Sequence, residues 1–443
     1  MSKNDIILRN PKQGALVKAT QQSQTFLTLL QQSDERRLVE ILKSIDFKEA
    51  TRLISSLEHI EWTAQFIEKY AEYWSWGILS SNEALPWSME LIERFENRWV
   101  WIICAFFDWG LSNNKALPWS IALIERFEER WDWGELGLSQ TEALPWSIAL
   151  IERFEERWDW SELSSNQALP WSIALIERFE DRWDWWRLSK NEALPWSIAL
   201  IERFEDRWGW WRLSKNEALP WSMEFFEHFE ERWDWASLSG NKALPWTMEF
   251  FERFEERWDW KRLSLNEALP WSIALIERFE ERWDWSELSS NQALPWSIAL
   301  IERFEDRWEW WRLSDNEALP WSMELIERFE GRWDWKRLSL NEALPWSMEF
   351  FEHFEDSWGF KGLSWNNALP WSIELIERFE DSWDFEGLSW NKALPWSIDL
   401  LEKFKYKWSW SDLAFNEKVQ QIFTALSVQG IEEVMDYHIE KLS

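Results

Sequence analysis

The amino-acid sequence predicts an all-α protein, an α-solenoid of about fourteen repeats of 25 residues with a helical cap at each end. Three observations predict this fold. The tetrapeptide A-L-P-W recurs along the chain, and from Pro145 to Pro395 its prolines are 25 residues apart. Apolar residues between these prolines follow the spacing of an amphipathic helix. The 46 tryptophans and 28 phenylalanines supply enough apolar surface for a continuous core.

The period divides the chain into three parts. Residues 1–60 lack the repeat and hold two or three short amphipathic stretches, which we expect to form an N-terminal helical cap or interaction segment. Asp34 and Asp46 are the expected N-caps of these stretches. Residues 61–415 are predicted to form the tandem-repeat α-solenoid. Residues 416–443 are predicted to form a C-terminal helical cap, because a terminal repeat otherwise exposes its inner face.

The repeat that begins at Pro270 illustrates the expected local structure. Pro270 suits the first turn of a helix, where its missing N–H is tolerated. A main helix of about fourteen residues, about 21 Å long, is predicted from there. One face of this helix gathers its apolar residues Trp271, Leu275, Ile276, Phe279 and Trp283. The rest of the repeat is a return segment with a short helical turn. Two capping boxes are predicted, Asp284 with Glu287 and Ser264 with Glu267.

Stacking of neighbouring repeats is expected to bury the tryptophans and to pair the charges. The equivalents of Trp271 and Trp283 recur at helical spacing, which favours core packing over a role as stacking platforms for ligands. On the predicted helix, Arg278 and Arg282 lie on one shoulder and Glu280 lies on the other. We therefore expect ion pairs between the arginines of one repeat and the glutamates of the next.

The charge balance restricts the classes of partner. The chain has 48 Lys and Arg residues against 80 Asp and Glu residues, a net charge of −32, which repels nucleic acid. Direct nucleic-acid binding is therefore not expected, and a protein partner with a basic surface is favoured. Glu277 and Glu281 are predicted to belong to a solvated acidic ridge, because a catalytic carboxylate pair would not recur in nearly every repeat. An acidic decoy that imitates nucleic acid is an alternative.

The sequence contains no motif typical of a catalytic, cofactor or metal site. His228 and Glu224 are spaced as a helical metal pair, but this histidine stands where other repeats have arginine, which favours a structural role. Cys104 is the single cysteine, so no internal disulfide forms, and a reducing, cytoplasmic setting is expected. The most apolar run, residues 99–107, is too short to cross a bilayer, so no membrane association is expected.

The return segments vary between repeats, whereas the frame around them recurs. A varied face on a repeated frame is typical of a binding surface, and neutral drift at exposed positions is the open alternative. The extra tryptophans of these segments are candidate partner-binding residues: Trp186, Trp211, Trp311, Trp365 and Trp390. An apolar insertion within residues 99–109 adds the candidates Trp101, Ile102 and Phe106. Packing of the insertion against residues 1–60 is the competing interpretation.

The pattern S-x-N-x-x-L-P-W-S, followed by W-D-W-x-x-L-S-x-N, resembles tryptophan-rich tandem-repeat proteins of microbes. The resemblance implies an α-solenoid and brings no activity or site residue with it. We therefore expect a non-enzymatic scaffold or adaptor for protein–protein interactions, without a cofactor. Binding of carbohydrate or peptide on exposed aromatic side chains is a further alternative. The sequence does not predict the oligomeric state.

Overall fold

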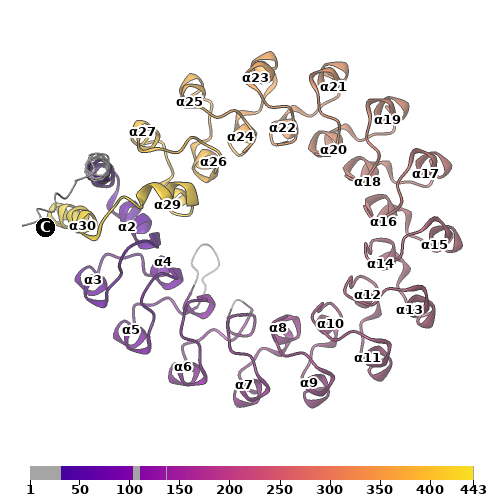
Figure 1. Ribbon diagram of the computed structural model, residues 1–443, viewed down its shortest axis with the longest axis horizontal. Coiled ribbons are helices and arrows are strands. Elements are labelled where there is room, and N and C mark those ends of the chain that lie inside the picture. Colours follow the sequence, from indigo (N-terminus) through magenta and orange to yellow (C-terminus); the bar gives the residue numbers. More distant parts are fainter. Residues whose placement is uncertain (1–30, 103–109, 136, 443) are drawn as a thin grey trace, which may run out of the picture. The chain divides into compact units, whose positions relative to one another are not determined.

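The structure is a computed structural model that describes residues 31–102, 110–135 and 137–442. Within these residues it is a regular succession of short helices without a strand, which confirms the predicted helical repeat solenoid (Figure 1). The chain forms two compact units. The first unit comprises Met1–Pro86, Ser372–Arg378 and Phe385–Ser443, and the second comprises Trp87–Trp371 and Phe379–Asp384.

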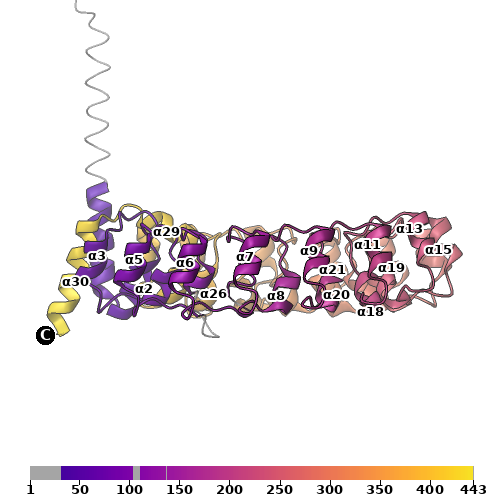
Figure 2. The same cartoon turned by 90° about the horizontal axis from the view of Figure 1, so that it is seen from below.

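Each repeat contributes one main helix of six residues. In the described part of the chain these are α3 (Ala64–Lys69), α5 (Met89–Arg94), α6 (Ile121–Arg126), α7 (Ile148–Arg153), α9 (Ile173–Arg178), α11 (Ile198–Arg203), α13 (Met223–His228), α15 (Met248–Arg253), α17 (Ile273–Arg278), α19 (Ile298–Arg303), α21 (Met323–Arg328), α23 (Met348–His353), α25 (Ile373–Arg378) and α27 (Ile398–Lys403). In the second unit these helices stand side by side in one tier (Figure 2).

A return helix of four to six residues follows most main helices. The return helices are α4 (Trp76–Ser81), α8 (Trp160–Ser165), α10 (Trp185–Leu188), α12 (Trp210–Leu213), α14 (Trp235–Ser239), α16 (Trp260–Leu265), α18 (Trp285–Ser290), α20 (Trp310–Asp315), α22 (Trp335–Leu338), α24 (Phe360–Leu363), α26 (Phe385–Trp390) and α28 (Trp410–Leu413). Two 3-10 turns are η1 (Leu111–Asn113) and η2 (Glu355–Ser357). The terminal segments add a helix over residues 31–44, α2 (Phe47–Ser56), α29 (Glu417–Phe423) and α30 (Val428–Leu442).

The main helix is six residues long rather than about fourteen, because side chains fix both of its ends. Ser272 begins α17 by accepting a hydrogen bond from the backbone N–H three residues later, at 3.2 Å. Pro270 precedes this N-cap and does not lie in the first helical turn. At the other end Phe279 leaves helical geometry (φ −117°, ψ 26°), and Trp283 Nε1 donates to the carbonyl oxygen of Ile276 at 3.2 Å. The apolar spacing therefore continues to Trp283 through turns instead of a helix.

The predicted caps are partly confirmed. Asp284 caps α18 and accepts a backbone hydrogen bond at 3.1 Å, and Asp46 caps α2 at 2.8 Å. Glu287 does not close the predicted box, because the Asp284 N–H donates to Ser264 Oγ. The predicted N-cap at Asp34 is wrong, because this residue lies inside the helix over residues 31–44. The capping box of Ser264 with Glu267 is also wrong. Ser264 is buried within α16, and its hydroxyl links two repeats instead.

Trp283 lies in the core as expected, Trp271 lies at the margin of the core, and the packing of the tryptophans crosses from repeat to repeat. Trp283 and Trp285 are 5% and 8% exposed, and Trp271 is half-buried. Trp271 packs on Trp283 of its own repeat, and Trp285 packs on Trp308 of the next, each with ring centroids 4.9 Å apart. Trp271 and Trp285 also donate their indole N–H to a backbone carbonyl oxygen, at 2.9 and 3.0 Å. These hydrogen bonds explain tryptophan at positions where phenylalanine would supply only packing.

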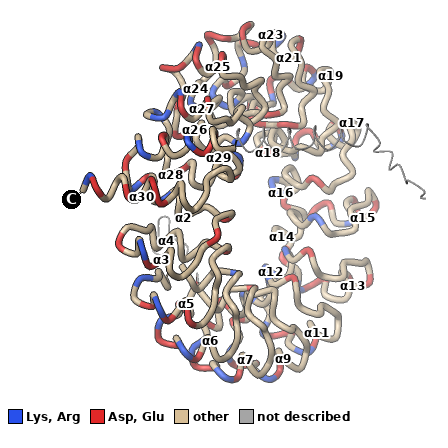
Figure 3. Tube along the Cα trace, turned by 60° about the vertical axis from the view of Figure 1, so that its left-hand side comes forward, with Lys and Arg blue, Asp and Glu red and all other residues tan. Residues whose placement is uncertain are grey.

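The predicted ion pairs between repeats are confirmed. Arg282 binds Glu255 and Glu256 of the preceding repeat, each at 2.8 Å, and Arg278 binds Glu252. Glu252 and Glu256 are the equivalents of Glu277 and Glu281, which were predicted to form a solvated acidic ridge. These carboxylates form ion pairs with arginines instead. Figure 3 shows acidic and basic residues next to each other along the main helices of the second unit. Most of these side chains are more than a third exposed, so each pair contributes at most about 1 kcal/mol.

Within the first unit, the N-terminal segment packs on the C-terminal repeats. Helix α2 lies between α4 and α28, and Ser55 Oγ accepts a hydrogen bond from the Ser75 N–H at 3.2 Å. The same serine bond joins each return helix to the next repeat, so α2 takes the place of a return helix. Arg37 binds Glu402 at 2.7 Å, as the repeat arginines bind the preceding main helix. Residues 31–56 therefore continue the contacts of the repeats, with α2 packed between α28 and α4.

Reversing one charge at this terminal contact is expected to loosen it. Lys43 Nζ lies 2.5 Å from Glu433 Oε1, and the lysine side chain is only 14% exposed. Glu433→Lys places two ammonium groups face to face and is expected to lower the free energy of unfolding of this unit by about 1 kcal/mol. Glu433→Gln removes only the attraction and is expected to have a smaller effect. Hydrogen exchange of the helix over residues 31–44 and of α30 measures both, and equal protection in all three proteins would contradict the contact.

Candidate binding surface on the return helices

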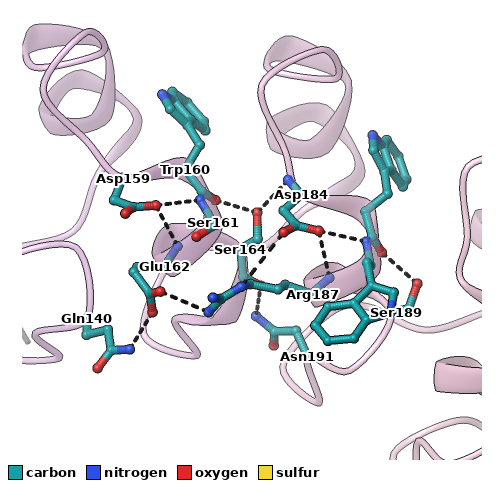
Figure 4. A network of polar contacts seen from close by, with 12 residues as sticks. Gln140, Asp159, Trp160, Ser161, Glu162, Ser164, Asp184, Arg187, Ser189 and Asn191 are labelled. Atoms are coloured by element: carbon teal, nitrogen blue, oxygen red, sulfur yellow. Dashed lines mark hydrogen bonds and ion pairs between the residues drawn. The ribbon is translucent and has the colours of Figure 1, made fainter. Parts of the chain in front are cut away.

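The return helices are held in place by the serine and the asparagine of the recurring L-S-x-N segment, in which Thr141 replaces one asparagine and Ala414 replaces one serine (Figure 4). Ser164 Oγ donates to the Trp160 carbonyl oxygen at 2.6 Å and accepts from the Asp184 N–H of the next repeat at 3.0 Å. Asn191 Nδ2 of that next repeat donates to the Ser164 carbonyl oxygen at 3.0 Å. Recurrence in the sequence marks these residues as structural, but it does not reveal that they join neighbouring repeats.

This anchoring leaves three variable positions on each return helix. In α10 they are Trp186, Arg187 and Lys190, of which the first and third are exposed and the second is half-buried. The same exposure recurs at α12, α16, α20 and α22. In the second unit the main helices form one row and the return helices another, and the array curves toward the return helices (Figure 1). We call the variable positions of α8 to α24 the return face.

The return face is basic and aromatic, although the whole chain has a net charge of −32. Its cationic side chains are Arg187, Lys190, Arg212, Lys215, Lys261, Arg262, Arg312, Lys336, Arg337 and Lys361. At the same positions the acidic side chains are Glu162, Glu287 and Asp315. The main helices therefore hold much of the acidic excess of the repeats, whereas the variable positions of the return helices have a net positive charge.

Some of these cations are neutralised by the preceding repeat. Arg187 Nη1 lies 2.9 Å from Glu162 Oε1, and this glutamate is 3% exposed (Figure 4). Arg312 binds Glu287 in the same way, at 3.0 Å. Because both glutamates are buried, these pairs belong to the frame and leave little charge for a partner.

Arg212 differs from these arginines because it is held between two indoles. Its guanidinium carbon lies 3.8 Å from the ring centroid of Trp186 and 3.9 Å from that of Trp211. Arg212 Nε is buried without an acceptor, and burial lowers the pKa of its guanidinium. Burial, together with the charges of Arg262 and Arg212, also lowers the pKa of Lys215. We call Trp186, Trp211 and Arg212 the Trp–Arg cluster. Arg212 and the neighbouring Lys215 concentrate positive charge there, and among the described residues no carboxylate forms an ion pair with Arg212.

A hollow of about 470 Å³ lies on the return face between α22 and α24. It is lined by Lys336, Leu340, Gly359, Lys361, Gly362 and Trp365. Gly362 occupies the second variable position, where the two preceding return helices have arginine. The missing side chain leaves the space open, and we call it the glycine hollow.

The five extra tryptophans predicted as partner-binding candidates are exposed on return helices or directly after them. Their exposed fractions are 46% for Trp186, 39% for Trp211, 40% for Trp311, 42% for Trp365 and 36% for Trp390. The structure does not gather them into one site. Trp186 and Trp211 form the Trp–Arg cluster, and Trp311 lies under Arg337. Trp365 lines the glycine hollow, and Trp390 stacks on Phe415 in the first unit.

The candidates from the apolar insertion have different fates. Trp101 is 6% exposed and packs on Trp131 with ring centroids 4.8 Å apart, in the position that Trp285 has in its repeat. Trp101 therefore belongs to the core, and its prediction as a partner-binding residue is wrong because the side chain is buried. Ile102 is 52% exposed. Phe106, like Cys104, lies outside the described residues.

His228, which is spaced with Glu224 as a metal pair would be, takes part in the ion pairs between repeats instead. His228 Nε2 lies 2.8 Å from Glu202 Oε1 of the preceding repeat, the place of the repeat arginine. In the described part of the chain no group of three or more His, Cys, Asp or Glu side chains is arranged to hold a metal ion. No described helix has the length and apolar character needed to cross a bilayer. Compared with known proteins, the chain matches no protein-family model, no curated protein and no solved structure.

Proposed function

We propose that the protein is a non-enzymatic scaffold that binds protein partners along its return face. The supporting observation is that exposed tryptophans and lysines project from the variable positions of a frame built from constant contacts. Trp186 and Trp211 are 46% and 39% exposed, whereas the frame tryptophans Trp183 and Trp208 are buried. Exposed aromatic and cationic side chains on one face are typical of protein interfaces.

The internal duplication of the chain supports the same proposal. Residues 145–269 and 270–394 are two copies of one five-repeat block. The copies differ at nine of the fifteen variable positions and at 18 of the other 110. The nine differences are Lys190/Asp315, Trp211/Lys336, Lys215/Leu340, Ala236/Lys361, Ser237/Gly362, Gly240/Trp365, Lys261/Glu386, Arg262/Gly387 and Leu265/Trp390. This fits a frame held by packing and a face whose chemistry has diversified, and neutral drift would leave a similar pattern.

The main-helix side suits a different partner. Asp181, Asp206 and Asp306 there have side chains that are 91%, 98% and 95% exposed, so a partner with a basic surface remains proposed for this side. Imitation of nucleic acid is a weaker alternative, because arginines alternate with the carboxylates along the columns. Carbohydrate binding is also weaker at Trp186 and Trp211, because Arg212 lies over both rings. The proposed scaffold uses no cofactor and works in the cytoplasm.

Site-specific crosslinking tests the proposal. A photoreactive amino acid is introduced at Trp211 or Lys336 on the return face, and at exposed Glu281 in the turn after main helix α17 as the matched control. Irradiation in the native host is expected to attach the same partner protein at Trp211 and Lys336, and mass spectrometry identifies it. Background labelling at both return-face positions would contradict the proposal and favour neutral drift. Crosslinks found only at Glu281 would indicate that the partner binds the main-helix side instead of the return face.

A further inference from the structure

We propose that the glycine hollow binds one large apolar side chain of a protein partner, in a segment where acidic residues flank that side chain. This inference rests on the proposed scaffold function and names the chemistry of the partner at one place on the return face. It follows from the apolar walls of the hollow and from the two lysines at its rim.

The walls of the hollow are apolar and open to solvent. Leu340 and Trp365 are 50% and 42% exposed and line the same hollow, so they form an exposed apolar patch instead of scattered single side chains. A Cβ atom on Gly362 would lie 3.1 Å from Ser339 Cβ and 3.3 Å from Leu340 Cγ, so glycine keeps the floor free. The volume of about 470 Å³ lies within the range of clefts that bind small groups. An apolar side chain that enters would bury its own surface and that of Leu340 and Trp365.

The rim of the hollow attracts anions. Lys336 and Lys361 are exposed, and among the described residues neither ammonium group has a carboxylate within ion-pair distance. The cations at the preceding return helices differ, because Arg312 binds Glu287 and Arg337 binds Asp315. Carboxylates on both sides of an inserted apolar side chain would supply the missing opposite charge.

An acidic protein segment fits this place better than nucleic acid does. Apart from the two lysines, the indole N–H of Trp365 and backbone groups, the lining offers no side chain that could form hydrogen bonds with the edge of a base. A long phosphate chain would also be repelled by the net charge of −32, whereas a short acidic segment interacts mainly with the local lysines.

The experiment uses the full-length protein and a fluorescent synthetic peptide in which one leucine is flanked on each side by two glutamates. Fluorescence anisotropy is expected to show saturable binding that weakens as salt is added. Gly362→Gln fills the hollow without adding charge and is expected to weaken binding at least about tenfold. The double variant Lys336→Gln and Lys361→Gln is expected to weaken binding similarly and to flatten the salt dependence. A peptide with serine in place of leucine is expected to bind weakly and to be insensitive to Gly362→Gln.

The chain offers matched controls for these variants. Glu287 occupies the second variable position behind Leu265, so a side chain of glutamine size is accommodated there behind a leucine. Thermal unfolding checks that Gly362→Gln keeps the fold. Leu340→Asp is a second variant that disrupts the apolar wall at an exposed position where the preceding repeat has Asp315. Tyr406→Ser, at a position that is 79% exposed and outside the return face, is expected to leave peptide binding unchanged.

Two results would overturn the inference. One is peptide binding that neither Gly362→Gln nor Leu340→Asp changes. The other is a single-stranded oligonucleotide that binds more tightly than the peptide and displaces it. If either occurs while crosslinks at Trp211 still capture the partner, the scaffold proposal stands and only the hollow loses its proposed ligand. Loss of both peptide binding and crosslinking overturns both proposals.

Discussion

Replacing Trp208 by alanine is expected to lower the free energy of unfolding of its repeat by about 3–5 kcal/mol. Trp208 is 5% exposed, and its ring lies 4.9 Å from that of Trp185 in the preceding repeat and 5.1 Å from that of Trp196. Its Nε1 also donates to the Ile201 carbonyl oxygen at 3.1 Å. The substitution therefore leaves a cavity between two repeats and a buried carbonyl oxygen without its donor.

Native-state hydrogen exchange is the suitable measurement, because long repeat arrays do not unfold in a single two-state step. Protection is expected to fall in α11 and α12 and to fall less in distant repeats. Trp208→Phe keeps most of the volume but loses the indole N–H, and a smaller loss of about 1–2 kcal/mol is expected. Trp211→Ala, three residues away and exposed, is the control and should change protection little. Similar protection in the variants of Trp208 and Trp211 would contradict the assigned core.

The second large effect is expected for Asn266→Ala, with a loss of about 2–4 kcal/mol. Asn266 is 1% exposed, and its Nδ2 donates to the carbonyl oxygens of Ser239 and Asn241 at 3.0 and 3.2 Å. Its Oδ1 accepts from the Ala268 N–H at 2.9 Å. Alanine leaves the Ser239 carbonyl oxygen of the preceding repeat and the Ala268 N–H without this partner, whereas the Asn241 carbonyl oxygen keeps the indole N–H of Trp246.

A matched variant of Asn266 is present in the chain itself. Thr141 occupies the equivalent position in an earlier repeat, and its Oγ1 donates to the Ser112 carbonyl oxygen at 2.9 Å. Asn266→Thr is therefore expected to keep one link between repeats and to lose less stability than Asn266→Ala. Unfolding in guanidinium chloride, followed by tryptophan fluorescence, ranks the variants. If the alanine variant equals the wild type, the asparagine link does not stabilise the array.

Several features of the fold followed from the sequence because every repeat has nearly the same surroundings. The pattern of Trp271, Leu275, Ile276 and Trp283 recurs so often that burial of one face is the only arrangement that satisfies all repeats. The opposite charges of Arg282 and Glu255 stand at equivalent shoulders, and stacking brings them to 2.8 Å. Side-chain periodicity does not indicate where backbone hydrogen bonding stops, so the short length of the main helix was not predictable.

The candidate surface was predictable only in part. Trp186 and Trp365 stood out because they interrupt a regular return segment, and both are exposed. Trp101 stood out for the same reason, but the insertion begins after it, so it keeps a core position. Gly362 gave no signal as a binding residue, because the effect of a missing side chain depends on the neighbouring repeat.

The sequence by itself determined the repeat, the helical class, the aromatic core and the sign of the net charge, since these depend on composition and on spacing within one repeat. Only the tertiary structure decided which charges face each other and which face solvent. Lys336 and Lys361 are 25 residues apart in the chain, and stacking places both at the rim of one hollow. Stacking likewise pairs the acidic ridge with arginines and leaves the return face basic. The physical reason is that contacts between repeats join residues that no pattern within a single repeat brings together.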